Sequence, residues 1–126
     1  MTALSFTTSD GVRLAYAIEG EGRPVILLHG FLSSTERNWR APGLVAALVE
    51  AGRQVIAPDA RGHGGSEAPT DPAAWPADVL ARDVVELAAH LNLADHDLAG
   101  YSMGGRTAVR AVLGGLAPRR LVIGGM

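Results

Sequence analysis

Residues 98–105 read Leu-Ala-Gly-Tyr-Ser-Met-Gly-Gly, a short apolar run leading into a serine that has glycine two positions before and two positions after it. The apolar run over 97–99 is typical of a short buried strand. Downstream, apolar residues recur at helical spacing at Val109, Val112, Leu113 and Leu116. The stretch therefore predicts a strand, a sharp turn at Ser102 and a helix from Met103 onward. In so tight a turn, a side chain at Gly100 or Gly104 would collide with neighbouring backbone.

The rest of the chain alternates short apolar runs with helical patterns. Two short strands are expected within residues 4–18, on either side of the turn signal Asp10-Gly11. Further strands are expected at 25–28, 55–57 and 121–123, helices at 44–49 and 80–91, and a loop over 61–76. This order predicts an α/β fold whose mostly parallel sheet is covered by helices and begins with an antiparallel hairpin.

Three polar stretches follow expected strands and should meet at one edge of the sheet. His29-Gly30, Asp59 and Ser102 each stand at such a strand end, and ligands of open α/β sheets bind at the carboxyl ends of the strands. A serine projected there is a candidate nucleophile. The backbone N–H of Met103, at the start of the following helix, would stabilise an oxyanion. The alternative is that the two glycines only permit close packing of the helix on the strand, since the pattern alone is weak in a chain with 16 glycines.

The same stretches carry a family resemblance. Gly100–Gly105 resembles the nucleophile elbow of the α/β-hydrolase family, His29-Gly30-Phe31 resembles its oxyanion loop, and Asp59–Ser66 resembles its Asp-x-Arg-Gly-x-Gly-x-Ser loop. The resemblance implies that Ser102 is the catalytic nucleophile and that Phe31 supplies a second oxyanion N–H. It also implies supporting roles for His29, Gly30, Gly100, Tyr101 and Gly104.

Each neighbouring residue also has a plainer interpretation. Phe31 is equally suited to be an aromatic wall of the pocket. His29 is expected to shape the oxyanion loop by hydrogen bonding rather than to act as a base, and His63 to anchor its own loop. We expect Asp59 to organise the loop that follows it, through Arg61, rather than to serve as the acid of a triad. Whether the side chains of Tyr101 and Met103 line the site or are buried in the elbow stays open.

The chain contains no candidate base after the serine. In α/β-hydrolases the triad runs in the order Ser, Asp or Glu, then His, whereas residues 103–126 contain neither acid nor histidine. We therefore expect residues 1–126 to form the N-terminal part of a single α/β-hydrolase domain. A separate chain or missing segment would supply the remaining strands, the cap, the acid and the histidine. The chain by itself would then be inactive, and the apolar strand at 121–123 would need a neighbour.

The function expected on these grounds is that of a serine hydrolase acting on an ester, lactone or related acyl substrate through an acyl-enzyme on Ser102. A C–C bond hydrolase or perhydrolase with the same elbow remains an alternative within the fold. A non-catalytic ligand-binding or scaffold member is the alternative from another class. Epoxide and haloalkane hydrolases are disfavoured, because those members of the family carry an aspartate where Ser102 stands.

Composition restricts the partners, the location and the cofactors to be expected. The net charge of −2 provides no electrostatic footprint for nucleic acid or an acidic membrane, so neither is an expected partner. The N-terminus lacks the pattern of a signal peptide, and no apolar run approaches the ~20 residues of a membrane span, so we expect a cytoplasmic protein. The chain has no cysteine, and its acidic residues show no metal-ligand cluster. No metal or cofactor is expected.

Overall fold

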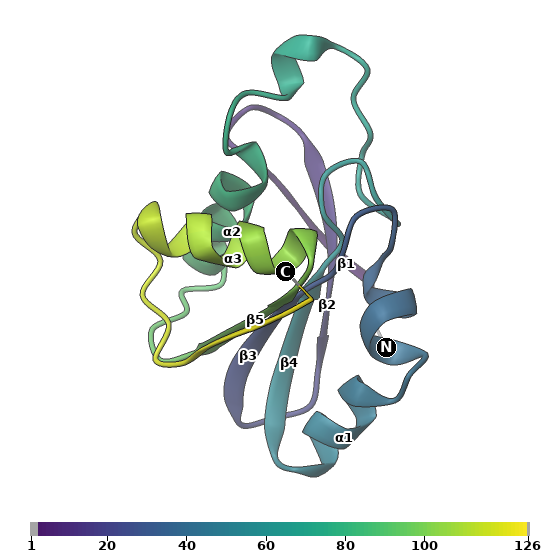
Figure 1. Ribbon diagram of the computed structural model, residues 1–126, viewed down its shortest axis with the longest axis vertical. Helices are drawn as coiled ribbons and strands as arrows, with labels where there is room; N and C mark the ends of the chain where they lie inside the picture. Colours follow the sequence, from purple (N-terminus) through teal and green to yellow (C-terminus); the bar gives the residue numbers. More distant parts are fainter. Residues whose placement is uncertain (1–2, 126) are drawn as a thin grey trace.

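Six strands form one mixed sheet, as a computed structural model describing residues 3–125 shows (Figure 1). Their order across the sheet is β1 (Ala3–Thr7), β2 (Arg13–Glu19), β4 (Arg53–Pro58), β3 (Arg23–Leu28), β5 (Asp97–Tyr101) and β6 (Leu121–Gly124). The pairs β1–β2 and β2–β4 are antiparallel, and the other three pairs are parallel. The predicted fold class is confirmed: a hairpin opens a mostly parallel sheet.

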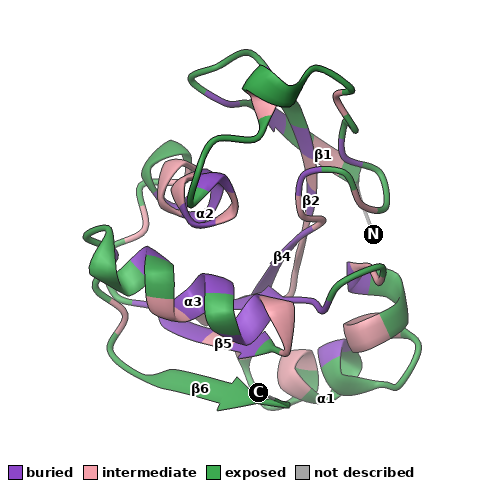
Figure 2. Ribbon diagram, turned by 45° about the horizontal axis from the view of Figure 1, so that its top comes forward, coloured by how far each residue is buried: buried purple, intermediate pink, exposed green. Residues whose placement is uncertain are grey.

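Helices cover both faces of this sheet. Helix α1 (Leu44–Glu50) lies on one face, and α2 (Val79–His90) and α3 (Met103–Leu113) lie on the other (Figure 2). Alternate residues of the central strand β3 point to opposite faces of the sheet and pack into two separate core clusters. Ile26 and Leu28 join the core cluster under α2 and α3, while Val25 and Leu27 join the smaller cluster under α1. A strand buried on both faces must be apolar throughout, which explains the continuous run at its end.

Helix α3 ends at Leu113, directly before Gly114 and Gly115, and Gly115 adopts a φ of 110°, which is open to glycine but strained for other residues. One element differs from the sequence prediction. A π-helix over Glu36–Arg40, which precedes α1, was not predicted. Its sequence Glu-Arg-Asn-Trp-Arg contains a single apolar side chain, so it offers no periodicity to detect.

A buried arginine joins four segments of the fold. Arg61, in the loop after β4, is 0% exposed. All five of its N–H groups are used: Nε and Nη2 donate to the carboxylate of Asp83 on α2, Nη1 and Nη2 donate to Asp10 in the hairpin turn, and Nη1 donates to the carbonyl of Ala74. These hydrogen bonds hold the pKa of Asp10 well below its usual range. Burial raises the pKa of Asp83, and the Arg61 guanidinium opposes that rise.

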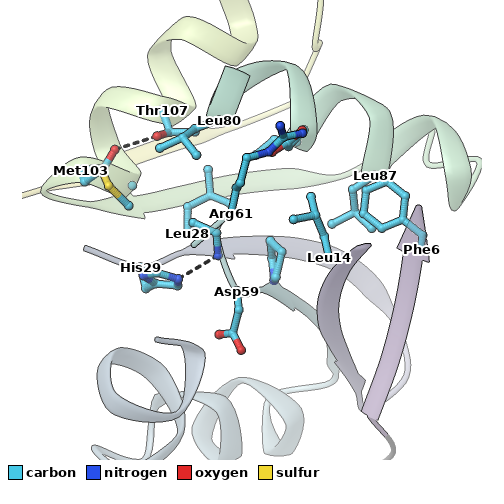
Figure 3. Close-up of a pocket in the computed structure, with 15 residues that line it drawn as sticks. Phe6, Leu14, Leu28, His29, Asp59, Arg61, Leu80, Leu87, Met103 and Thr107 are labelled. Carbon is cyan, nitrogen blue, oxygen red and sulfur yellow. Dashed lines mark hydrogen bonds and ion pairs between the residues drawn. The ribbon is translucent and has the colours of Figure 1, made fainter. Parts of the chain in front are cut away.

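The expected link between Asp59 and Arg61 is therefore wrong. The two side chains point in opposite directions (Figure 3). The Asp59 carboxylate accepts hydrogen bonds from the backbone N–H groups of Thr35, at 2.9 Å, and Gly65, at 2.9 Å. Asp59 does organise its own loop, but through backbone amides, because the guanidinium is already saturated by two other carboxylates.

Replacing Arg61 by methionine should lower the free energy of unfolding by about 3–5 kcal/mol, because it leaves Asp83 buried without a partner. Arg110→Met is the matched control: Arg110 also pairs with an aspartate, Asp78 at 2.7 Å, but both side chains are more than half exposed. That variant should lose less than about 1 kcal/mol. Urea denaturation measures both. Equal losses would contradict the assignment of Arg61 as the central structural arginine.

Candidate active site

The serine singled out by the sequence lies in a strained turn. Ser102 has φ 55° and ψ −114°, between the end of β5 at Tyr101 and the start of α3 at Met103. Few residues other than glycine adopt a positive φ, and such strain is maintained only where the surroundings impose it. Here the Ser102 N–H donates to the Gly124 carbonyl of β6 at 2.8 Å, which fixes the turn from one side. The predicted strand, turn and helix are confirmed.

The two flanking glycines are required by backbone contacts. A Cβ at Gly100 would overlap the carbonyl oxygen of Gly104, and a Cβ at Gly104 would overlap the carbonyl oxygen of Leu28 at the end of β3. The first turn of α3 therefore rests directly on the ends of two neighbouring strands. Gly30 lies on the other side of the serine, where a Cβ would stand 3.6 Å from the Ser102 Cβ. The structure thus brings the predicted oxyanion loop beside the predicted nucleophile.

Most backbone N–H groups of that loop are already bonded. Within residues 30–35, the Gly30 N–H donates to Asn38 Oδ1 at 2.7 Å, and the Leu32 N–H donates to His63 Nε2 at 3.0 Å. The Ser33 N–H donates to the Gly30 carbonyl at 3.2 Å, and the Thr35 N–H donates to Asp59 Oδ1 at 2.9 Å. In contrast, the Phe31 N–H has no acceptor within the described chain. The loop therefore keeps its shape through side chains around it and leaves one amide beside Ser102 free.

His29 orients this free amide. The imidazole is 2% exposed, its Nε2 accepts from the Ala60 N–H at 3.0 Å, and its Nδ1 therefore carries the proton and donates to the Gly30 carbonyl at 2.8 Å (Figure 3). Burial lowers the pKa of His29, which favours this neutral form. In a trans peptide the carbonyl and the next N–H point in opposite directions. Holding the Gly30 carbonyl on the His29 side thus directs the Phe31 N–H away from it.

An open hollow of about 510 Å³ lies above the turn. Its lining consists of Phe31, Ser102, Met103, Arg106 and Gly125. The Met103 N–H, at the first position of α3, has no acceptor in residues 3–125, like that of Phe31. The lining of the hollow therefore includes the Ser102 side chain and two residues, Phe31 and Met103, whose backbone N–H groups have no acceptor within the described residues. Such a set suits attack on a carbonyl whose oxygen becomes negatively charged.

The remaining predicted site residues divide between the hollow and its support. The Phe31 side chain is 67% exposed and meets the His63 ring edge-on, so it forms a rim rather than a buried wall. Tyr101 is 48% exposed, against Gly125. Met103 lines both the hollow and a separate cavity of about 30 Å³, whose lining Figure 3 shows. Neither Tyr101 nor Met103 is buried in the elbow.

Sequence reasoning missed two residues at this site. Asn38 lies in the unpredicted π-helix, and nothing in its local pattern points to Gly30, eight positions earlier. Arg106 was detectable, since it stands four positions, about one helical turn, after Ser102. Within residues 3–125, no group of three or more acidic or histidine side chains is arranged to hold a metal ion. Nor is any helix there long and apolar enough to cross a bilayer.

Comparison with known proteins agrees with this geometry. The sequence model of the α/β hydrolase fold matches residues 23–115. The chain belongs to the α/β-hydrolase family. It is 39% identical over 106 residues to the non-heme chloroperoxidase CPO-A1 of Kitasatospora aureofaciens, covering 84% of this chain and 37% of that protein. It is 38% identical over 99 residues to a soluble epoxide hydrolase of Corynebacterium, covering 79% and 32%.

Solved structures extend the match to almost the whole chain. The esterase EaEST of Exiguobacterium antarcticum superposes with a TM-score of 0.87 at 27% identity, over 97% of this chain and 44% of that one. The α/β-hydrolase described by residues 3–125 therefore spans less than half the length of these relatives. Enzymes with different reactions share this portion, so the match shows the fold and the broad enzyme class rather than one substrate.

Substituting Gly104 by alanine should destabilise the protein by at least about 2 kcal/mol, because the added Cβ overlaps the Leu28 carbonyl and neither backbone segment can move away. Gly114→Ala provides the control. Gly114 has φ −84°, and its added Cβ would lie 3.4 Å from the nearest atom, so the change should stay within about 1 kcal/mol. Thermal or urea unfolding compares them. A tolerated Gly104→Ala would contradict the proposed contact.

The buried His29 should make stability depend on pH. Unfolded His29 binds a proton near pH 6.5, and the folded protein binds it only at lower pH. Since the unfolded state then binds more protons, the free energy of unfolding should fall as pH drops below about 6.5. His29→Gln removes this titration and keeps an oxygen able to accept from Ala60. Its urea midpoint should therefore vary less between pH 8 and pH 5 than that of the wild type; identical pH profiles would refute the assignment.

Proposed function

We propose that this α/β-hydrolase is a serine hydrolase acting on an ester, lactone or related acyl substrate, with Ser102 as its nucleophile. The observation that carries the proposal is the strained serine facing a hollow that also contains two residues with free backbone N–H groups. The backbone N–H groups of Phe31 and Met103 are proposed to bind the oxyanion. Close packing of the helix on the strand would explain the two glycines. It would not explain why His29 and Asn38 fix the Gly30 backbone so that the Phe31 N–H stays free.

The reaction would proceed in two stages. The Ser102 oxygen attacks the substrate carbonyl carbon, its proton passes to a base, and the carbonyl electron pair moves onto oxygen as the oxyanion. Collapse of this intermediate expels the alcohol, which takes the proton from the base, and leaves an ester on Ser102. Water then attacks that ester by the same route and releases the acid. Within the described residues, His29 and His63 are unsuited as bases, because both nitrogens of each ring are engaged by the backbone.

The base and its partner acid are proposed to come from a complementing C-terminal segment of the same hydrolase, after the family order of the triad. Two observations support this. The chain spans 37% and 44% of the chloroperoxidase and the esterase it resembles. In addition, β6 is the outer strand of the sheet, and its residues are exposed. The carbonyls of Arg120 and Gly124 face β5, so by alternation the polar backbone groups of Leu121 and Ile123 face outward, available to a further strand.

Relatives support a second reaction class in the same site. The 39% identity to a non-heme chloroperoxidase favours keeping a perhydrolase, in which peroxide replaces water at the second stage, as the alternative. A C–C bond hydrolase would use the same elbow. An epoxide hydrolase reaction is disfavoured despite the 38% identity to one, since the nucleophile position holds a serine here. A cytoplasmic location is proposed with the hydrolase function.

A fluorophosphonate probe, which modifies activated serines, tests the proposal. Native protein, purified from its source under mild conditions with any complementing segment, should be labelled at Ser102, as mapped by peptide mass spectrometry. The recombinant 126-residue chain should react at least ~10³-fold more slowly, because no base activates the serine. Ser102→Ala and urea-unfolded samples are the controls. A folded, complete native assembly that leaves Ser102 unlabelled would favour a non-catalytic binding protein.

A further inference from the structure

Arg106 stands at the same opening as the nucleophile. It lies on α3 four residues after Ser102, and its backbone N–H donates to the Ser102 carbonyl at 3.1 Å. Position 106 thus lies one helical turn, or ~5.4 Å along the axis, beyond the turn that contains Ser102. Arg106 is exposed and lines the hollow above the turn together with Ser102 and Phe31. Its guanidinium is therefore carried by the same rigid helix that positions the nucleophile.

The charge among the described residues that line this hollow is positive. Among the described residues that line it, Arg106 has the one charged side chain, and none of them carries a carboxylate. The N-terminus of α3, with its partial positive charge, opens into the same space. Within residues 3–125 Arg106 forms no ion pair. In contrast, Arg110, one turn further on, pairs with Asp78 at 2.7 Å and lines a different groove, between α2 and α3.

We propose that Arg106 binds an anionic group of the substrate, a carboxylate a few bonds from the carbonyl that Ser102 attacks; this substrate class rests on the proposed hydrolase function. A planar guanidinium donates two parallel hydrogen bonds to a carboxylate, which gives orientation as well as attraction. The single turn between Arg106 and Ser102 sets the spacing of the two substrate groups. The preferred substrate is therefore a half-ester, with one free carboxylate, rather than a simple neutral ester.

Binding of a matched pair of small esters tests this. Monomethyl succinate carries a carboxylate three bonds from its ester carbonyl, and dimethyl succinate is its neutral counterpart. Each is titrated into the ¹⁵N-labelled 126-residue chain at low salt, following the backbone amide signals of Phe31, Ser102 and Met103 by NMR. The half-ester should bind about 5-fold more tightly than the diester, as an exposed ion pair contributes. The difference should shrink at high salt.

The variants separate Arg106 from a general effect of positive charge. Arg106→Gln should abolish the preference for the half-ester, while Arg110→Gln, which changes the next turn of the same helix, should preserve it. Amide spectra of both variants confirm that each is folded. Equal affinities for the two esters, or a preference that survives Arg106→Gln, would overturn the proposal and leave Arg106 a solvated surface residue.

The same titration separates the proposed anion binding by Arg106 from the proposed serine hydrolase function. Ser102→Ala should keep the preference for the half-ester, since binding needs no nucleophile. A preserved preference together with absent fluorophosphonate labelling of the native assembly would mean an anion-binding site without serine catalysis. Labelling of Ser102 without any preference for the half-ester would mean a serine hydrolase that does not use Arg106 for its substrate.

Discussion

The close approach of α3 to the ends of β3 and β5 is the contact on which the site depends. Only glycine fits at 100 and 104, because a Cβ at either position would overlap a backbone carbonyl. This contact compresses the turn between strand and helix, so that Ser102 takes a positive φ and projects from the sheet edge. The same geometry leaves the first amide of the helix free and places Arg106 one turn above the serine. The proposed nucleophile, the proposed oxyanion donor and the proposed anion site thus depend on one packing constraint.

Opposite the serine, the structure uses polar side chains to control individual backbone amides. Two neutral histidines, His29 and His63, each accept one N–H and donate to one carbonyl, and Asn38 and Asp59 bind further amides of the same loop. A loop without regular secondary structure must satisfy its backbone groups in this way. The Phe31 N–H, which the orientation of the Gly30 carbonyl directs away from His29, has no acceptor within the described residues. Its place at the hollow that also contains Ser102 supports its proposed role as an oxyanion donor.

The prediction from sequence succeeded where a local pattern has one physical interpretation. Continuous apolar runs such as 25–28 belong to strands buried on both faces, and the glycines around Ser102, between an apolar run and a helical pattern, predict a compressed turn. It failed where partners are distant along the chain. Arg61 was assigned to its near neighbour Asp59, whereas its carboxylates stand 51 positions before it and 22 positions after it. The π-helix that carries Asn38 has no periodicity and was missed.

The sequence by itself determined the α/β class, the strand ends at which polar residues gather, and the glycine-flanked serine, because hydrophobic period and backbone sterics act over a few residues. The tertiary structure alone decided which backbone amides are free and which carboxylates neutralise Arg61. Those properties depend on directions of hydrogen bonds and on contacts between segments that only the folded sheet brings together. The partners of each charged or hydrogen-bonding group are fixed only when the chain folds, so the chemistry of this site follows from the folded structure.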